Sequence, residues 1–154
     1  MIALGSDHGG LELKEAIKDL LSARGIPFED CGTDNGDSVD YPDFGEKVAC
    51  KVAGGQVDKG ILVCGTGIGM SIVANKFPGV RAALVTDPFM ARMAKEHNNA
   101  NILVLGGRVL AKEDARAMVA TWLDAAFEGG RHQARLDKIG LLEEKMCEFT
   151  SRNC

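Results

Sequence analysis

Gly60-Ile61-Leu62-Val63-Cys64-Gly65-Thr66-Gly67-Ile68-Gly69-Met70-Ser71 is an apolar run that ends at a cysteine and opens into alternating glycines. Apolar residues followed directly by glycine-rich backbone predict a buried strand that ends in a loop. The next residues, 72–76, favour a helix. The loop therefore leads from the end of a strand to the N-terminus of a helix.

Cys64 is the last residue of this predicted strand. In open parallel sheets the ligand crevice lies beyond the carboxyl ends of the strands. Free N–H groups at a helix N-terminus bind anions and favour the thiolate form of a nearby cysteine. We interpret Cys64 as a reactive thiolate, and the alternative is a small apolar residue of the core.

Short apolar runs alternate with amphipathic stretches along the chain. Strands are expected over residues 2–5, 28–31, 60–64, 81–85 and 102–105. Helices are expected through residues 13–21, after residue 41, at 72–76 and 87–96, around Met118, Val119, Trp122, Leu123 and Ala126, which face the core, and from about Leu136. This alternation predicts an α/β fold in which helices cover both faces of a parallel sheet. We expect a single domain over residues 1–154.

Charge and composition exclude several classes of protein. Of the 154 residues, 45% are hydrophobic and 26% are charged, and the formal net charge is -4. Nucleic-acid binders are usually basic, and no apolar run approaches the roughly 18 residues of a spanning helix. The N-terminus lacks the basic region and apolar core of a signal peptide. We expect no nucleic-acid partner and no membrane association.

The chain contains five cysteines, which are Cys31, Cys50, Cys64, Cys147 and Cys154. The number is odd and no C-x-x-C pair occurs, which argues against both a disulfide framework and a zinc site. We therefore expect reduced thiols, a cytoplasmic protein and no metal.

Two of the three histidines follow predicted elements closely. His8 follows the first strand within Ser6-Asp7-His8-Gly9-Gly10, an arrangement like that of the Cys64 loop, so both strand ends are expected to share one crevice. His97 ends the predicted helix at 87–96. The alternatives are a loop histidine for His8, a helix N-cap for Asp7, and a cation at a helix C-terminus for His97.

Three arginines are candidates for binding a phosphate. Arg108 follows the fifth predicted strand, and Arg131 and Arg135 flank His132. Guanidinium groups match the geometry of phosphate oxygens. The alternative is a solvated cluster of charges.

The glycine loop does not fit three better-known loops. A dinucleotide fingerprint from Gly65 needs a glycine where Met70 stands, and the Gly-Lys-Ser/Thr of a P-loop is absent. A cysteine phosphatase loop needs an arginine about six residues beyond Cys64, and that position is again Met70.

Several separated motifs together resemble the type-B ribose 5-phosphate isomerases, a family that includes allose and galactose 6-phosphate isomerases. The motifs are Ser6-Asp7-His8-Gly9-Gly10, Asp40-Tyr41-Pro42, Cys64 to Ser71, Ala74-Asn75-Lys76, Glu96-His97-Asn98, Gly106-Gly107-Arg108 and Glu128-Gly129-Gly130-Arg131-His132. The resemblance implies a cofactor-free aldose–ketose isomerase with a three-layer α/β/α Rossmann-like fold, a five-stranded parallel sheet, and a dimer or a dimer of dimers. One branch of the family has a glutamate base at the position of Met70, so this chain resembles the cysteine branch.

The resemblance also implies roles for individual residues. Cys64 would move a proton between C2 and C1 of the open-chain sugar, and Thr66 with the loop amides would stabilise the enediolate. His97 would open the furanose ring, with Asp7 as its counterpart on the anomeric hydroxyl. The implied substrate-binding residues are His8, Tyr41, Gly65, Gly67, Ile68, Gly69, Ser71, Asn98, Arg108, Arg131 and Arg135.

Other functions remain open at this point. A non-catalytic sugar-phosphate sensor has no need for a thiol at a strand end, and a flavodoxin-like module has few aromatics here with which to enclose a ring. Ribose 5-phosphate is the favoured substrate, and allose or galactose 6-phosphate is the alternative.

The order of the predicted elements also bears on assembly. Cys64 and Asp7 end strands, whereas His97 ends a helix that has returned to the amino end of the fifth strand. These are opposite edges of one sheet, roughly 15–20 Å apart. We therefore expect active sites shared between the two chains of a dimer.

Overall fold

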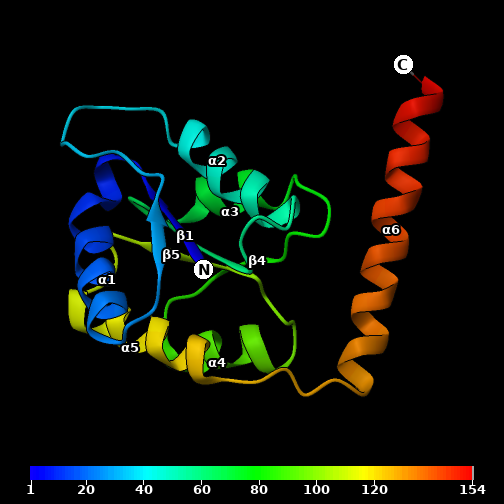
Figure 1. Ribbon diagram of the computed structural model, residues 1–154. Coiled ribbons are helices and arrows are strands. Elements are labelled where there is room, and N and C mark those ends of the chain that lie inside the picture. The colour runs from blue at the N-terminus through cyan, green and yellow to red at the C-terminus, as the bar shows by residue number, and fades with distance from the viewer. Residues whose placement is uncertain (154) are drawn as a thin grey trace.

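The computed structural model describes residues 1–153 (Figure 1). The strands are β1 (Ile2–Ser6), β2 (Phe28–Asp30), β3 (Lys59–Cys64), β4 (Ala82–Leu84) and β5 (Ile102–Gly106). The helices are α1 (Leu11–Ala23), α2 (Tyr41–Ala53), α3 (Ile68–Ala74), α4 (Pro88–Glu96), α5 (Lys112–Asp124) and α6 (Arg131–Asn153), and the 3-10 turn η1 (His8–Gly10) precedes α1.

The five strands form one parallel sheet in the order β2-β1-β3-β5-β4. From β1 the chain goes to β2 on one side of the sheet, and on the other side it passes through β3 to the edge strand β4 and back to β5, so its direction reverses between β1 and β3. Such a switch point is where open α/β sheets bind ligands. The predicted α/β/α fold with a five-stranded parallel sheet is confirmed, and so is the adjacency of the first and third strands.

Helices cover both faces of the sheet (Figure 1). Alternate residues of β3 point to opposite faces. Ile61 and Val63 pack with the buried Trp122 of α5 in the core beneath α1, α4 and α5. Leu62 and Cys64 pack in the second core, beneath α2 and α3. The two cores hold the sheet rigid, so the carboxyl ends of the strands are fixed points for a site.

The glycine loop is shorter than predicted. The helix expected at residues 72–76 begins at Ile68 and ends at Ala74. Gly67 is the residue before it, with a φ of 80°. This left-handed conformation turns the chain sharply into the helix and suits glycine. The loop between β3 and α3 is therefore reduced to Gly65, Thr66 and Gly67.

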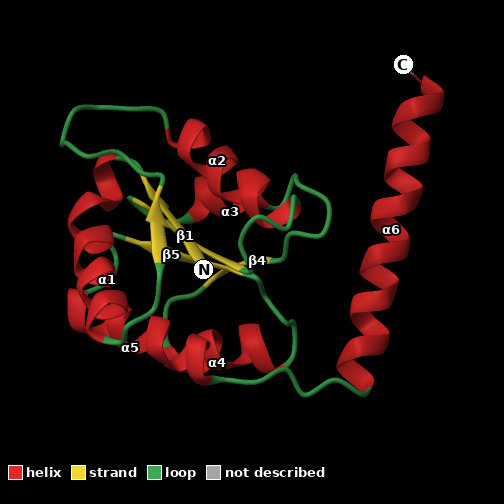
Figure 2. Cartoon of the chain, viewed as in Figure 1, coloured by secondary structure: helices red, strands yellow, loops and turns green. Residues whose placement is uncertain are grey.

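Two further boundaries differ from the prediction, one on either side of the loop that joins α5 to α6 (Figure 2). α5 ends at Asp124, so Ala126 lies outside the helix and is exposed rather than in the core. α6 begins at Arg131 and not at about residue 136. Gly129 and Gly130, the last two residues of the loop before α6, have φ values of 65° and 53°.

α6 stands beside the layered body, past β4 (Figure 1). Gly79 N–H donates to the carboxylate of Glu143 at 3.0 Å, one contact between the helix and the body. Ile139, Leu141 and Leu142 are exposed along it. Over the described residues, no helix combines the length and apolar character that crossing a bilayer requires.

Candidate active site

The thiol of Cys64 lies at the carboxyl end of β3 and is 5% exposed. The backbone N–H of Gly67 donates to its Sγ at 3.1 Å. An amide that donates to sulfur holds the thiol in one orientation. Cys31, Cys50 and Cys147 are also free in the structure, and Cys154 lies outside the described residues.

Two glycines, Gly67 in the loop and Gly69 in the first turn of α3, are required by close contacts. A Cβ at Gly67 would lie 2.5 Å from Leu84 Cδ1, and a Cβ at Gly69 would lie 2.6 Å from the ring of Tyr41. Such distances are shorter than any normal carbon contact. The ring of Tyr41, at the start of α2, therefore lies directly against the first turn of α3.

The end of β1 meets the same loop. The carboxylate of Asp7 accepts from Gly10 N–H at 3.0 Å, which caps η1 as the N-cap alternative predicts. A Cβ at Gly9 would lie 3.1 Å from Gly65 N, so the two loops are in contact. His8 Nδ1 accepts from Val39 N–H at 3.2 Å. The other ring nitrogen, Nε2, takes no part in this bond.

The loop after β5 completes this edge of the sheet. Gly107 N–H donates to the carbonyl of Cys64 at 2.8 Å, and Arg108 N–H donates to the carbonyl of Gly65 at 2.9 Å. The Arg108 side chain lies over Gly65 and is exposed. Thr66 and Ser71 bond locally: Thr66 Oγ1 accepts from Ile68 N–H at 3.4 Å, and Ser71 Oγ donates to the Ile68 carbonyl at 2.8 Å.

His97 and Asn98 lie at the other edge of the sheet. His97 caps the C-terminus of α4, five residues before β5 begins at Ile102, whereas Cys64 pairs with Gly106 at the far end of β5. A five-residue strand spans about 13 Å. The chain thus places the predicted site residues in two groups, with His97, Asn98, Arg131 and Arg135 away from Cys64.

Two residues in contact with His97 are not among the site residues predicted from the sequence. His132 stacks on His97, with ring centroids 4.1 Å apart and planes inclined by 11°. Glu128 Oε2 lies 3.8 Å from His97 Nε2 and 3.4 Å from His132 Nε2. The motif that contains both residues was visible in the sequence, but their contact with His97 was not.

The group His97, Glu128 and His132 has the composition of a metal site, with ligand atoms within 4.8 Å of one another. An imidazole binds a metal ion in the plane of its ring, so two ligand rings must have planes that meet at the ion. The stacked rings are nearly parallel, and their planes do not meet nearby. This geometry does not suit a shared ion.

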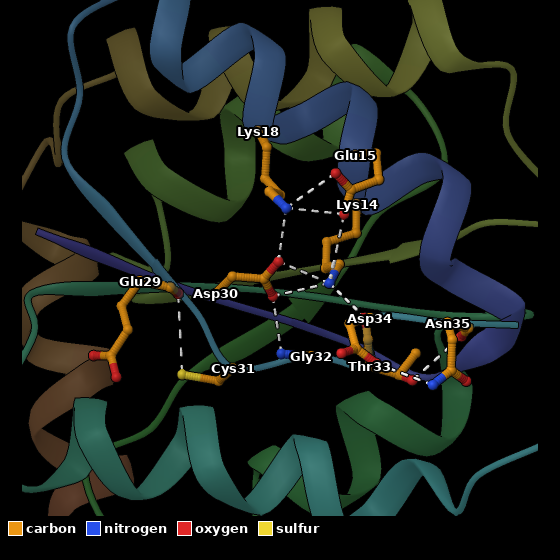
Figure 3. A network of polar contacts seen from close by, with 10 residues as sticks. All are labelled: Lys14, Glu15, Lys18, Glu29, Asp30, Cys31, Gly32, Thr33, Asp34 and Asn35. Carbon is orange, nitrogen blue, oxygen red and sulfur yellow. Dashed lines mark hydrogen bonds and ion pairs between the residues drawn. The ribbon is translucent and has the colours of Figure 1, made fainter. Parts of the chain in front are cut away.

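A buried lysine holds the long loop before α2 (Figure 3). Lys14 is 1% exposed, and its Nζ donates to both carboxylate oxygens of Asp30 at 2.9 and 2.8 Å and to the Thr33 carbonyl at 2.6 Å. Burial alone would raise the pKa of Asp30, but hydrogen bonds from Lys14, Gly32 and Lys18 lower it overall. Because the same loop supplies Val39 N–H to His8, this network supports the site.

Comparison with known proteins identifies the family. A sequence model described as Ribose/Galactose Isomerase matches residues 2–139. Ribose-5-phosphate isomerase B of Escherichia coli is 46% identical over 144 residues, covering 94% of this chain and 97% of that protein. The structure of Clostridium thermocellum ribose-5-phosphate isomerase B superposes with a TM-score of 0.92 at 56% identity, covering 94% of this chain and 98% of the other.

A solved structure with a bound sugar phosphate points to the same class. Ribose-5-phosphate isomerase B of Mycoplasma genitalium with bound ribulose-5-phosphate superposes with a TM-score of 0.90 at 44% identity, covering 93% of this chain and 95% of the other. The chain belongs to the ribose/galactose isomerase family. It is a sugar-phosphate isomerase, as the resemblance in the sequence predicted.

Proposed function

We propose that the protein interconverts ribose 5-phosphate and ribulose 5-phosphate through an enediolate, without a cofactor. The observation that carries this proposal is the thiol of Cys64 at the carboxyl end of β3, held by the N–H of Gly67 at 3.1 Å. The similarity to ribose-5-phosphate isomerases B supports the choice of substrate.

Cys64 acts as the base in the proton transfer. The thiolate takes the proton from C2 of the open-chain aldose, and the electron pair of that bond forms the C1–C2 double bond while the C1 oxygen becomes negative. Loop amides and Thr66 stabilise this charge. The thiol then returns the proton to C1 as the C2 oxygen becomes the carbonyl, and the hydroxyl proton passes from the C2 oxygen to the C1 oxygen.

His97 acts as the acid in ring opening. It donates a proton to the ring oxygen while Asp7 accepts the proton of the anomeric hydroxyl, so the bond from C1 to the ring oxygen breaks and the C1 carbonyl forms. Asp7 lies at the edge that holds Cys64, and its carboxylate already accepts from Gly10 N–H.

The other predicted residues bind the sugar and its phosphate. Tyr41 and Asn98 hold hydroxyl groups, and the segment 65–71, which comprises the loop and the first turn of α3, surrounds the reacting carbons. His8, Arg108, Arg131 and Arg135 bind the phosphate, since charged hydrogen bonds to phosphate are strong and directional. Of the arginines, only Arg108 lies at the Cys64 edge of its own chain among the described residues.

A homodimer or a dimer of dimers with shared sites follows from this separation. One small sugar cannot contact Cys64 and His97 of the same chain, because β5 lies between them. An isologous interface brings the Cys64 edge of one chain to the His97 edge of the other, twice. Ile68 and Ile72 on α3 and Phe89 on α4 are more than half exposed beside the Cys64 edge, as an uncovered interface would be.

The alternative substrate is allose or galactose 6-phosphate, and the family description names galactose beside ribose. The experiment compares kcat/KM for ribose 5-phosphate with kcat/KM for both hexose phosphates, detecting ketose by NMR. Ribose 5-phosphate is expected to have the highest kcat/KM. A higher kcat/KM for a hexose phosphate would make that hexose phosphate the preferred substrate instead. Sugar-phosphate binding without ketose formation would instead indicate a non-catalytic binding protein.

A further inference from the structure

The side chain of His97 has little support from its own helix. It caps α4 and is 36% exposed, and the helix contributes the bond from its backbone N–H to the Met93 carbonyl at 3.0 Å. This backbone bond does not select one rotamer of the half-exposed imidazole. An acid that must meet one ring oxygen needs a fixed orientation, because a displacement of about 1 Å can cost 10²-fold in rate.

His132 offers a rigid surface for this ring. It is 4% exposed and stacks face to face on His97 at 4.1 Å. Its backbone is fixed by the bond from His132 N–H to the Gly129 carbonyl at 2.9 Å, and Glu128 N–H donates to the Glu96 carbonyl at 3.0 Å. The segment that carries His132 is thus joined directly to the end of α4.

The charges around the pair distinguish the two rings. Burial, followed by the charges of His97 and Arg131, lowers the pKa of His132, so this ring is neutral at neutral pH. The carboxylate of Glu128 faces Nε2 of both rings. Nδ1 of His97 is then the nitrogen that faces away from Glu128 and remains for the sugar.

We infer that His132 and Glu128 are positioning residues that hold the His97 imidazole for ring opening. His132 provides the flat surface on which the ring rests, and the carboxylate of Glu128 lies 3.8 Å from its Nε2. This inference rests on the proposed role of His97 as the ring-opening acid. Neither His132 nor Glu128 contacts the sugar in this arrangement.

A double-mutant cycle tests the inference. His132→Asn removes the stacking surface and is expected to lower kcat for ribose 5-phosphate about 10- to 100-fold with little change in KM. His132→Phe keeps the surface and should retain kcat within about threefold of wild type. In the His97→Asn background, His132→Asn should have no further effect, because it acts only through His97. Gln133→Ala, on the exposed side of α6, is the matched control.

A second readout separates positioning from a general loss of structure. Ribulose 5-phosphate cannot form a furanose, because its C5 oxygen carries the phosphate. Exchange of its C1 hydrogen with D₂O therefore requires Cys64 but not ring opening. His132→Asn should leave this exchange within about twofold of wild type, whereas Cys64→Ala should abolish it.

Three results would overturn the inference. They are an unchanged kcat in His132→Asn, an equal loss of C1 exchange in that variant, and a further loss of kcat when His132→Asn is added to His97→Asn. If His97→Asn itself left kcat unchanged, the failure would be that of His97 as the acid. The two failures are thus distinguishable in one set of variants.

Discussion

Gly67 N–H donates to Cys64 Sγ at 3.1 Å across a loop of three residues. The bond depends on the left-handed conformation of Gly67, which turns its amide back toward the end of β3. The thiol is therefore held at the switch point of the sheet, next to the loop that follows β1.

Replacement of this thiol tests the proposed base. Cys64→Ala should lower kcat by about 10²- to 10⁴-fold, the usual loss when a proton-transfer group is removed. Binding of a sugar phosphate and the thermal transition should change little. Cys50→Ala, at an exposed cysteine on α2, is the control and should keep full activity. An alanine variant that retained a third of the wild-type kcat would make Cys64 a core residue.

The arginines of α6 should act on the phosphate alone. Arg131→Ala and Arg135→Ala should each weaken kcat/KM for ribose 5-phosphate by about 1.5–3 kcal/mol per lost charged hydrogen bond, and hardly affect unphosphorylated ribose. Arg92→Ala, which removes a surface pair with Glu96, is the control. Equal losses for both sugars would assign these arginines to the fold.

Subunit mixing tests the shared site. Cys64→Ala and His97→Ala, each inactive, are unfolded together and refolded. About half of the dimers should be mixed, and each mixed dimer has one complete site, so roughly a quarter of wild-type activity should return. The control mixes Cys64→Ala with a variant that carries both Cys64→Ala and His97→Ala. It should restore nothing, because no chain in that mixture has Cys64. No recovery in the first mixture, with subunit exchange demonstrated, would contradict the shared site.

Lys14 should contribute strongly to stability. Lys14→Ala removes a buried partner of Asp30 and should lower the free energy of unfolding by about 3 kcal/mol, the lower end for a broken buried pair, since Asp30 is partly exposed. Lys18→Ala, on the same carboxylate but more exposed, should cost less than about 1 kcal/mol. Urea unfolding measures both, and equal losses would show that burial of Lys14 has no special effect.

His132 should make stability depend on pH. Burial, then His97 and Arg131, lowers its pKa below the usual 6.5, against the opposite effect of Glu128. Between its lowered folded pKa and 6.5, the unfolded chain binds a proton that the folded chain does not, so the free energy of unfolding rises with pH through that window and levels off above it. His132→Asn should remove this part of the slope in urea midpoints, while Gln133→Ala keeps it. An unchanged slope in His132→Asn would contradict the assignment.

The placement of Cys64 and of the glycine loop could be predicted because the signals are local. An apolar run of four to six residues predicts a buried strand, and the glycines mark its end. The start of α3 was missed by four residues, because only the φ of Gly67 decides where the helix begins. Ala126 was assigned to the core on helical spacing, but α5 ends two residues earlier.

The sequence by itself determined the parallel α/β fold, the two loops of the switch point and the opposite placement of Cys64 and His97, since these follow from periodicity and from the order of elements. Only the tertiary structure decided that His132 lies under His97 and that Lys14 is buried against Asp30. Histidine and lysine occur both in solvent and in the interior, and which applies depends on the elements that pack around them. Burial and stacking between segments distant in sequence leave no local pattern, so these contacts became visible only in the folded chain.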